Sequence, residues 1–182
     1  MPPELIADLL ADIDRRWGLA PDAEISLEAN PVSAPQAHLQ ALKAAGITRL
    51  SLGVQALDAA ALKFLGRTHS LEQAEAAFVA ADGIFDRGSL DLIYARPGQS
   101  LDGWAQELQH ALALAPSHMS LYQLTIEPET PFFKRHAAGK FQMPDEALAA
   151  DMYELTQDLC AAAGLPAYEV SNHVREGHAC RH

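Results

Sequence analysis

The stretch at residues 49–55, Arg-Leu-Ser-Leu-Gly-Val-Gln, constrains the fold of this chain more than any other part of the sequence. Leu50, Leu52 and Val54 alternate with residues that are polar or small. Alternation with a period of two is typical of a β-strand whose two faces meet different surroundings. We therefore predict a strand at 49–55, with helices packed on its apolar face and a polar space on the other side.

Strand-like and helix-like patterns alternate along most of the chain. The strands are expected at 24–29, 49–55, 89–94, 118–126 and 167–171. Because helical patterns separate them, each strand can return parallel to the previous one through a right-handed crossover. A doubly wound sheet would bury both faces, whereas these strands keep polar residues on one face. We predict an α/β fold, namely a partial, open TIM-like βα barrel with about four to five parallel strands, as a single incomplete domain over residues 1–182.

Three polar side chains stand near the carboxyl ends of the expected strands: Glu28, Gln55 and Asp91. Ligands of βα barrels bind at this end, where the loops after the strands converge. These residues are therefore candidates for a binding site. A simpler alternative is that Glu28 and Asp91 are polar barrel residues paired with Arg49, and that Gln55 only satisfies a backbone group.

The composition narrows the classes of function. Lys and Arg total 13 against 24 Asp and Glu, a formal net charge of -11, which disfavours nucleic acid as a partner. No apolar run approaches the roughly 20 residues that span a bilayer, and the N-terminus lacks the pattern of a signal peptide, so we expect a cytoplasmic protein. Two cysteines, Cys160 and Cys180, are too few to hold a metal cluster by thiolates alone.

Six short motifs occur in a fixed order along the chain. They lie at residues 28–31, 46–55, 65–69, 91–99, 121–128 and 168–172. The series resembles the coproporphyrinogen III dehydrogenase family of radical S-adenosylmethionine (SAM) proteins, and its last two motifs look most like the heme chaperone (HemW) branch. The resemblance covers nearly the whole chain and implies the radical SAM type of barrel.

The resemblance gives the candidate residues a role. It implies that Glu28, Gln55, Arg67 and Asp91 line the SAM site, and that backbone groups of residues 122–125 contact the adenine. The carboxylates can accept hydrogen bonds from ribose hydroxyls and the methionine ammonium, and Arg67 can pair with the methionine carboxylate. Arg67 also follows an expected helix end, where a cation is favourable without any ligand.

The resemblance also implies a [4Fe-4S] cluster that this sequence cannot hold. Family members bind the cluster through a Cys-x-x-x-Cys-x-x-Cys motif, which these 182 residues lack. We therefore expect the chain to be the central part of a longer protein that carries the cluster, and to be inactive alone. A natural paralogue without a cluster is the alternative. An open barrel of this kind would also expose the edge of strand 24–29, through which we expect self-association.

Three functions are compatible with the sequence. The first is heme handling of the heme chaperone type, with heme or a porphyrin and a heme-acceptor protein as partners. The second is oxygen-independent oxidative decarboxylation of coproporphyrinogen III. The third is a catalytically silent barrel that acts as a binding module.

Some residues fit the family pattern less well. Ala95 and Arg96 stand where the family usually has glycine followed by an apolar residue, so we expect crowding and an added charge near the site. His178, Cys180 and His182 have the spacing of a metal or heme ligand set, although a chain end without such a role is the simpler interpretation.

Overall fold

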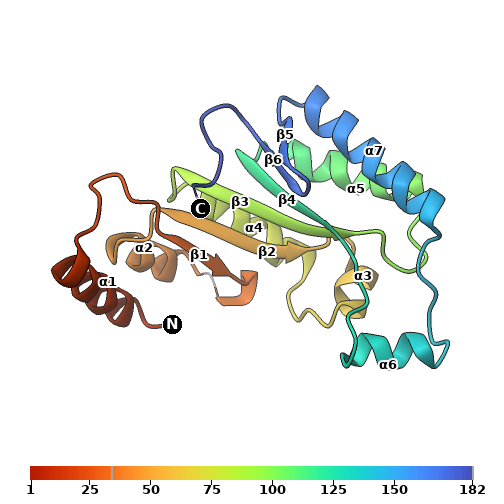
Figure 1. Ribbon diagram of the computed structural model, residues 1–182, viewed down its shortest axis with the longest axis horizontal. Helices are drawn as coiled ribbons and strands as arrows, with labels where there is room; N and C mark the ends of the chain where they lie inside the picture. Colours follow the sequence, from red (N-terminus) through yellow and green to blue (C-terminus); the bar gives the residue numbers. More distant parts are fainter. Residues whose placement is uncertain (34, 182) are drawn as a thin grey trace.

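The computed structural model describes residues 1–33 and 35–181 (Figure 1). Its helices are α1 (Pro3–Trp17), α2 (Gln36–Ala44), α3 (Ala59–Phe64), α4 (Leu71–Asp82), α5 (Leu101–Ala113), α6 (Pro131–Ala137) and α7 (Glu146–Ala162), with a 3-10 turn η1 at Pro31–Ser33. Its strands are β1 (Ser26–Ala29), β2 (Arg49–Gln55), β3 (Arg87–Tyr94), β4 (His118–Gln123), β5 (Ala167–Glu169) and β6 (Asn172–Val174). None of the described helices is long and apolar enough to cross a membrane. His182 lies outside the described residues.

The strands form one sheet in the order β1-β2-β3-β4-β6-β5. The first four are parallel, as the alternating pattern predicts. The expected fifth strand is present as β5, but it is not parallel to the others: it forms a hairpin with β6, which pairs antiparallel with both β4 and β5. Strands of three residues are too short to show a period of two, which is why the sequence did not indicate β6.

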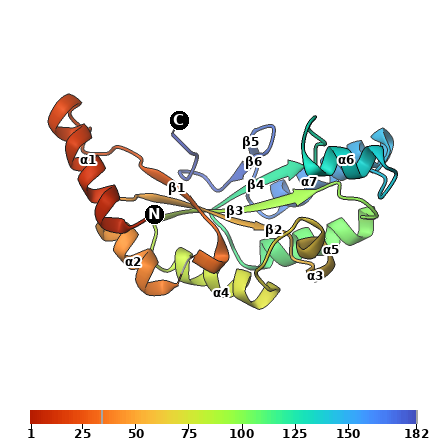
Figure 2. The same ribbon diagram turned by 90° about the horizontal axis from the view of Figure 1, so that it is seen from below.

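The apolar face of the sheet carries the hydrophobic core. Leu50, Leu52, Leu90 and Leu92 are at most 1% exposed. Helices α2, α4 and α5 lie below the sheet in Figure 2, and the C-terminal segment lies above it. Trp104 of α5 is fully buried, and its ring stacks on Tyr94 with centroids 4.8 Å apart. This one-sided helical cover is the arrangement predicted for an open barrel.

Side-chain caps fix where several helices begin. Helix α4 begins with a capping box, in which Ser70 and Gln73 bond to each other's backbone. Helix α3 is capped by Asp58, which accepts a hydrogen bond from the Ala61 N–H at 2.7 Å. Helix α6 was not expected, although Thr130 caps it through the Phe133 N–H at 3.1 Å and Pro131 stands in its first turn. A helix of seven residues shows too little periodicity to be recognised in a loop.

Candidate cofactor site on the polar face of the sheet

The registers of the parallel strands bring polar side chains into adjacent rows. Glu28 of β1 lies beside Ser51 of β2, and Asp91 of β3 lies beside Ser120 of β4. A cavity of about 440 Å³ opens over this face and is lined by Glu28, Ser51 and Ser120 among others. The face opposite the helices is therefore a polar, hollowed surface, as the alternation at 49–55 predicts.

Both carboxylate oxygens of Asp91 accept hydrogen bonds from serines of this face. Its Oδ2 accepts from the Ser51 hydroxyl at 2.6 Å, and its Oδ1 accepts from the Ser89 hydroxyl at 2.8 Å. Burial raises the pKa of the carboxyl, the serine hydroxyls act in the opposite direction, and the nearby Glu28 carboxylate raises it further. Among the described residues no hydrogen bond joins Arg49 to the Asp91 or Glu28 carboxylate, and its guanidinium donates to the His178 carbonyl at 3.2 Å.

Gln55 is turned back over the polar face by an irregular end of β2. Its φ is 74°, in the left-handed region, and the pairing of β2 with β3 shifts register between Leu52 and Gln55. A Cβ on Gly53 would lie only 2.6 Å from the Gln55 Nε2 and 3.7 Å from the Ala29 carbonyl oxygen. The side-chain amide therefore needs a glycine beneath it, and it lies close to the end of β1.

Arg67 lies on the loop between α3 and α4, whereas the other three candidates lie on strands β1, β2 and β3. Gly66 has a φ of 71°, and the Arg67 N–H donates to the Leu62 carbonyl at 2.8 Å. The Arg67 Nε is buried with no hydrogen-bond partner among the described residues. His69 ties this loop to β2, because its buried ring bonds the Val54 carbonyl at 3.0 Å. The structure thus brings Glu28, Gln55 and Asp91 onto one face and fixes the Arg67 loop to the end of the same strand as Gln55.

A buried ion pair on the helix-covered side of the sheet joins the loop after β2 to the loop after β3, and the sequence did not indicate it. Glu107 of α5 pairs with Arg96, and its Oε1 accepts from the Leu57 N–H at 2.7 Å. The Gln99 side chain also donates to Glu107 at 3.2 Å. One carboxylate therefore holds both the loop after β2 and the loop after β3. The signal that was available is a glutamate inside the apolar stripe of α5.

The two departures from the family pattern have plain structural counterparts. Arg96 points away from the polar face into the ion pair with Glu107, so the expected added charge is neutralised. Ala95 has a φ of 55° and is 3% exposed. That φ favours glycine, which agrees with the residue that is usual there.

A second cavity, of about 880 Å³, lies at the carboxyl end of β4. Its walls include Ile93, Tyr122, Leu124, Thr125 and Tyr153. Ile93 is two residues beyond Asp91 on the same face of β3, so this cavity adjoins the carboxylate row. Apolar and aromatic walls beside a few polar groups suit a flat heteroaromatic ring.

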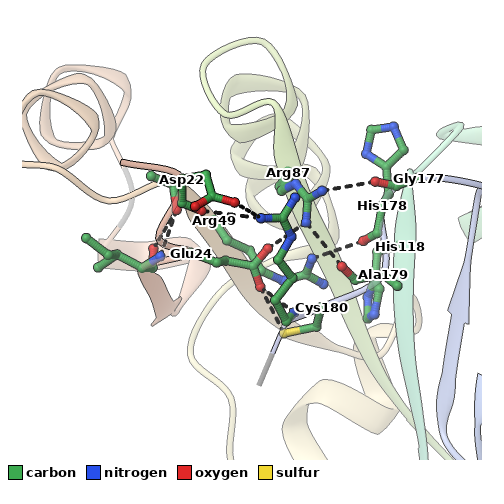
Figure 3. A network of polar contacts seen from close by, with 12 residues as sticks. Asp22, Glu24, Arg49, Arg87, His118, Gly177, His178, Ala179 and Cys180 are labelled. Atoms are coloured by element: carbon green, nitrogen blue, oxygen red, sulfur yellow. Dashed lines mark hydrogen bonds and ion pairs between the residues drawn. The ribbon is translucent and has the colours of Figure 1, made fainter. Parts of the chain in front are cut away.

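At the opposite end of the sheet, the C-terminal segment binds the first residues of the strands (Figure 3). Glu24 pairs with Arg87 at 2.7 Å and accepts from the Cys180 thiol at 3.2 Å. Burial acts to raise the pKa of Glu24, but hydrogen bonds from the Arg181 N–H, Cys180 and Arg87 outweigh it and lower the pKa. Arg87 also donates to the carbonyls of Gly177 and Ala179.

This network gives one of the residues suspected as ligands a structural partner, because the Cys180 thiol donates to Glu24. His178 is held through its backbone carbonyl, which accepts from Arg49, while its ring Nδ1 is buried without a hydrogen-bond partner among the described residues. No group of three or more His, Cys, Asp or Glu side chains that could hold a metal ion occurs within residues 1–33 and 35–181. Cys160 is buried in α7, where burial raises the pKa of its thiol to about 12. These described residues therefore provide no ligand set for a [4Fe-4S] cluster.

The family model of the radical SAM superfamily matches residues 1–111. The chain belongs to the radical SAM superfamily. The fold agrees: the structure titled "Coproporphyrinogen III oxidase (HemN) from Escherichia coli is a Radical SAM enzyme" matches with a TM-score of 0.82 at 24% identity, over 97% of this chain and 41% of that one. The predicted radical SAM type of α/β fold is thus confirmed.

Two curated relatives are more similar in sequence. The chain is 43% identical over 176 residues to "Radical S-adenosyl methionine domain-containing protein 1, mitochondrial" of Mus musculus, which covers 96% of this chain and 40% of the relative. It is 40% identical over 183 residues to "Heme chaperone HemW" of Synechocystis, which covers 100% of this chain and 44% of the relative. The chain therefore spans less than half the length of these relatives.

Proposed function

We propose that this radical SAM chain forms the SAM-binding part of a longer protein that handles heme. One observation carries the proposal: Glu28, Gln55 and Asp91 lie on one polar face, beside the cavity lined by Ile93 and Tyr122. Carboxylates and an amide suit the ribose hydroxyls and the methionine ammonium, and the adjoining apolar cavity suits the adenine. The buried, unpaired Nε of Arg67 is a donor for the methionine carboxylate.

The cluster belongs to the longer protein in this proposal. In radical SAM proteins a [4Fe-4S] cluster supplies the electron that cleaves bound SAM. The contribution of this chain is to bind and orient the cofactor with the four residues named above. In this proposal, residues 1–182 bind the cofactor and a segment outside them binds the iron.

Heme is the proposed cargo because several relatives that are 39–40% identical to this chain are named heme chaperones. HemW of Escherichia coli is 39% identical over 175 residues, whereas the dehydrogenase-type HemN structure is 24% identical. A heme-acceptor protein would then be the partner. Decarboxylation of coproporphyrinogen III is the second candidate, favoured by the shared fold. The cytoplasmic location stays a prediction, since the mouse relative is named mitochondrial.

Calorimetric titration of SAM into the chain and into the cluster-loaded longer protein tests the cofactor site. Glu28→Gln, Asp91→Asn and Arg67→Ala should each weaken binding at least about tenfold, since each removes a hydrogen bond to a charged group. Glu4→Gln is the matched control, because Glu4 is an exposed acid of α1. Wild-type affinity in all three variants, or no SAM binding by the longer protein, would instead support the silent binding module.

The choice between the two porphyrin functions needs a separate assay. The longer protein should bind heme and should leave coproporphyrinogen III unchanged under anaerobic, reducing conditions with SAM. Formation of the decarboxylated product would overturn the heme chaperone proposal in favour of the dehydrogenase.

A further inference from the structure

A chain of hydrogen bonds crosses the polar face from the C-terminal segment to Asp91. The Cys180 N–H donates to the Tyr168 hydroxyl at 3.3 Å, and that hydroxyl lies 2.8 Å from the Nε2 of His118. The Nδ1 of His118 lies 2.8 Å from the Ser89 hydroxyl, which bonds Asp91. Ser89 and His118 are each 2% exposed, so water does not compete for the bond between them.

The direction of each bond follows from the number of hydrogens available. Ser89 has one hydroxyl hydrogen, which it donates to the Asp91 Oδ1 at 2.8 Å, so its oxygen can only accept from its other two neighbours, His118 and Ser120. The Ser89 oxygen must then accept from His118, so Nδ1 carries a proton. Burial and the nearby Arg49 lower the pKa of His118 to about 3, so the ring is neutral and Nε2 has only a lone pair. Tyr168 therefore donates to Nε2.

We infer that His118 is a positioning residue for Asp91: as the Nδ1–H tautomer, it orients the Ser89 hydroxyl so that its hydrogen points to the carboxylate. With Ser51 and Ser89 engaging its two oxygens, Asp91 is held in one rotamer beneath the serines that line the 440 Å³ cavity. The inference rests on the proposed function only where it concerns SAM. It also links residue 180 to the candidate cofactor site through three side chains.

Nitrogen-15 NMR of the imidazole in the 182-residue chain tests the tautomer without any cofactor. We expect a protonated Nδ1 and an unprotonated Nε2 for His118. Ser89→Ala should move the ring toward the Nε2–H tautomer, because Nδ1–H loses its acceptor while Tyr168 can accept from Nε2. Tyr168→Phe is the matched control and should leave Nδ1 protonated. An Nε2–H tautomer in the wild type, or no change in Ser89→Ala, would overturn the inference.

Two substitutions at His118 test the effect on SAM. The Asn amide nitrogen can replace Nδ1 and still donate to Ser89, whereas the Gln amide reaches the position of Nε2 instead. With SAM as the titrant, His118→Gln should bind about fivefold more weakly than His118→Asn, within the usual range for residues coupled through one network. Equal affinities of the two folded variants would refute the positioning role. If the wild type binds no SAM, the proposed function fails and the tautomer measurement alone decides the inference.

Discussion

Replacing Glu107 by Gln should destabilise the fold more than replacing Arg96 by Met, although both break the same buried ion pair. Arg96 is 5% exposed and Glu107 is 9% exposed, so neither charge is solvated. In Glu107→Gln the amide oxygen can still accept from the Leu57 N–H, but the guanidinium loses its counter-charge. Its Nη1 already lacks a partner among the described residues. We expect a loss of about 3–5 kcal/mol in the free energy of unfolding.

Arg96→Met leaves the carboxylate better supported. Glu107 keeps the Leu57 N–H at 2.7 Å and the Gln99 amide at 3.2 Å, so we expect a loss of about 1–3 kcal/mol. The double variant Arg96→Met/Glu107→Gln buries no charge and retains the acceptor for Leu57. It should lie within about 1 kcal/mol of the wild type, since neutral replacement of a buried pair is often tolerated.

Urea unfolding followed by near-ultraviolet circular dichroism of Trp104 measures all four proteins. Trp104 is a suitable probe because it is fully buried and stacked on Tyr94. The double variant should be at least about 2 kcal/mol more stable than the sum of the single effects predicts. If the two effects simply add, Arg96 and Glu107 do not interact in the folded protein, and Glu107 does not hold the two loops in the way described.

Three further predictions concern the sheet. Gly53→Ala should weaken SAM binding as much as Gln55→Ala, because a Cβ at residue 53 would displace the Gln55 amide. Calorimetry should show no further loss of affinity in the double variant, and additive losses would contradict this. The pKa of His118 is about 3 in the folded state against 6.5 in the unfolded state, so between these pH values the unfolded state binds one proton more. The free energy of unfolding should therefore fall by up to about 1.4 kcal/mol for each pH unit between 6.5 and 3. The raised pKa of Asp91 acts in the opposite direction, so the free energies of unfolding of wild type and His118→Asn are compared across this pH range. A difference between the two proteins that does not change with pH would refute the prediction. Finally, β1 stands at one edge of the sheet, so sedimentation velocity should show concentration-dependent self-association, and a monomer at every concentration would count against pairing through that edge.

The sequence was most informative where one element's own pattern decides its structure. Alternation at residues 49–55 predicted β2 with the bounds that the structure has, and it predicted the polar face correctly. The capping box at Ser70 and Gln73 likewise depends on residues three apart. For the candidate site, the motifs identified Glu28, Gln55 and Asp91, which the registers of neighbouring strands bring onto one face.

What could not be predicted depends on residues far apart in the sequence. The Glu24–Arg181 hydrogen bond joins positions 157 residues apart, and no local pattern specifies it. The role of Glu107 required knowledge of which loops meet the start of α5. The left-handed turn of Gln55 also lay beyond the pattern, because period-two alternation does not report a bulge at the end of a strand.

The four parallel strands stand side by side in the order in which they occur along the chain. By the time the ribosome has made one of these strands, the preceding strand with which it pairs has already been made. The sheet can therefore grow by successive addition, through pairings between residues 23 to 38 positions apart. The C-terminal segment is different, since its contact with Arg49 spans 129 residues. It can dock only after the sheet exists, and local opening of the molecule should release it first, which exposes the polar face while the helix-covered core stays folded.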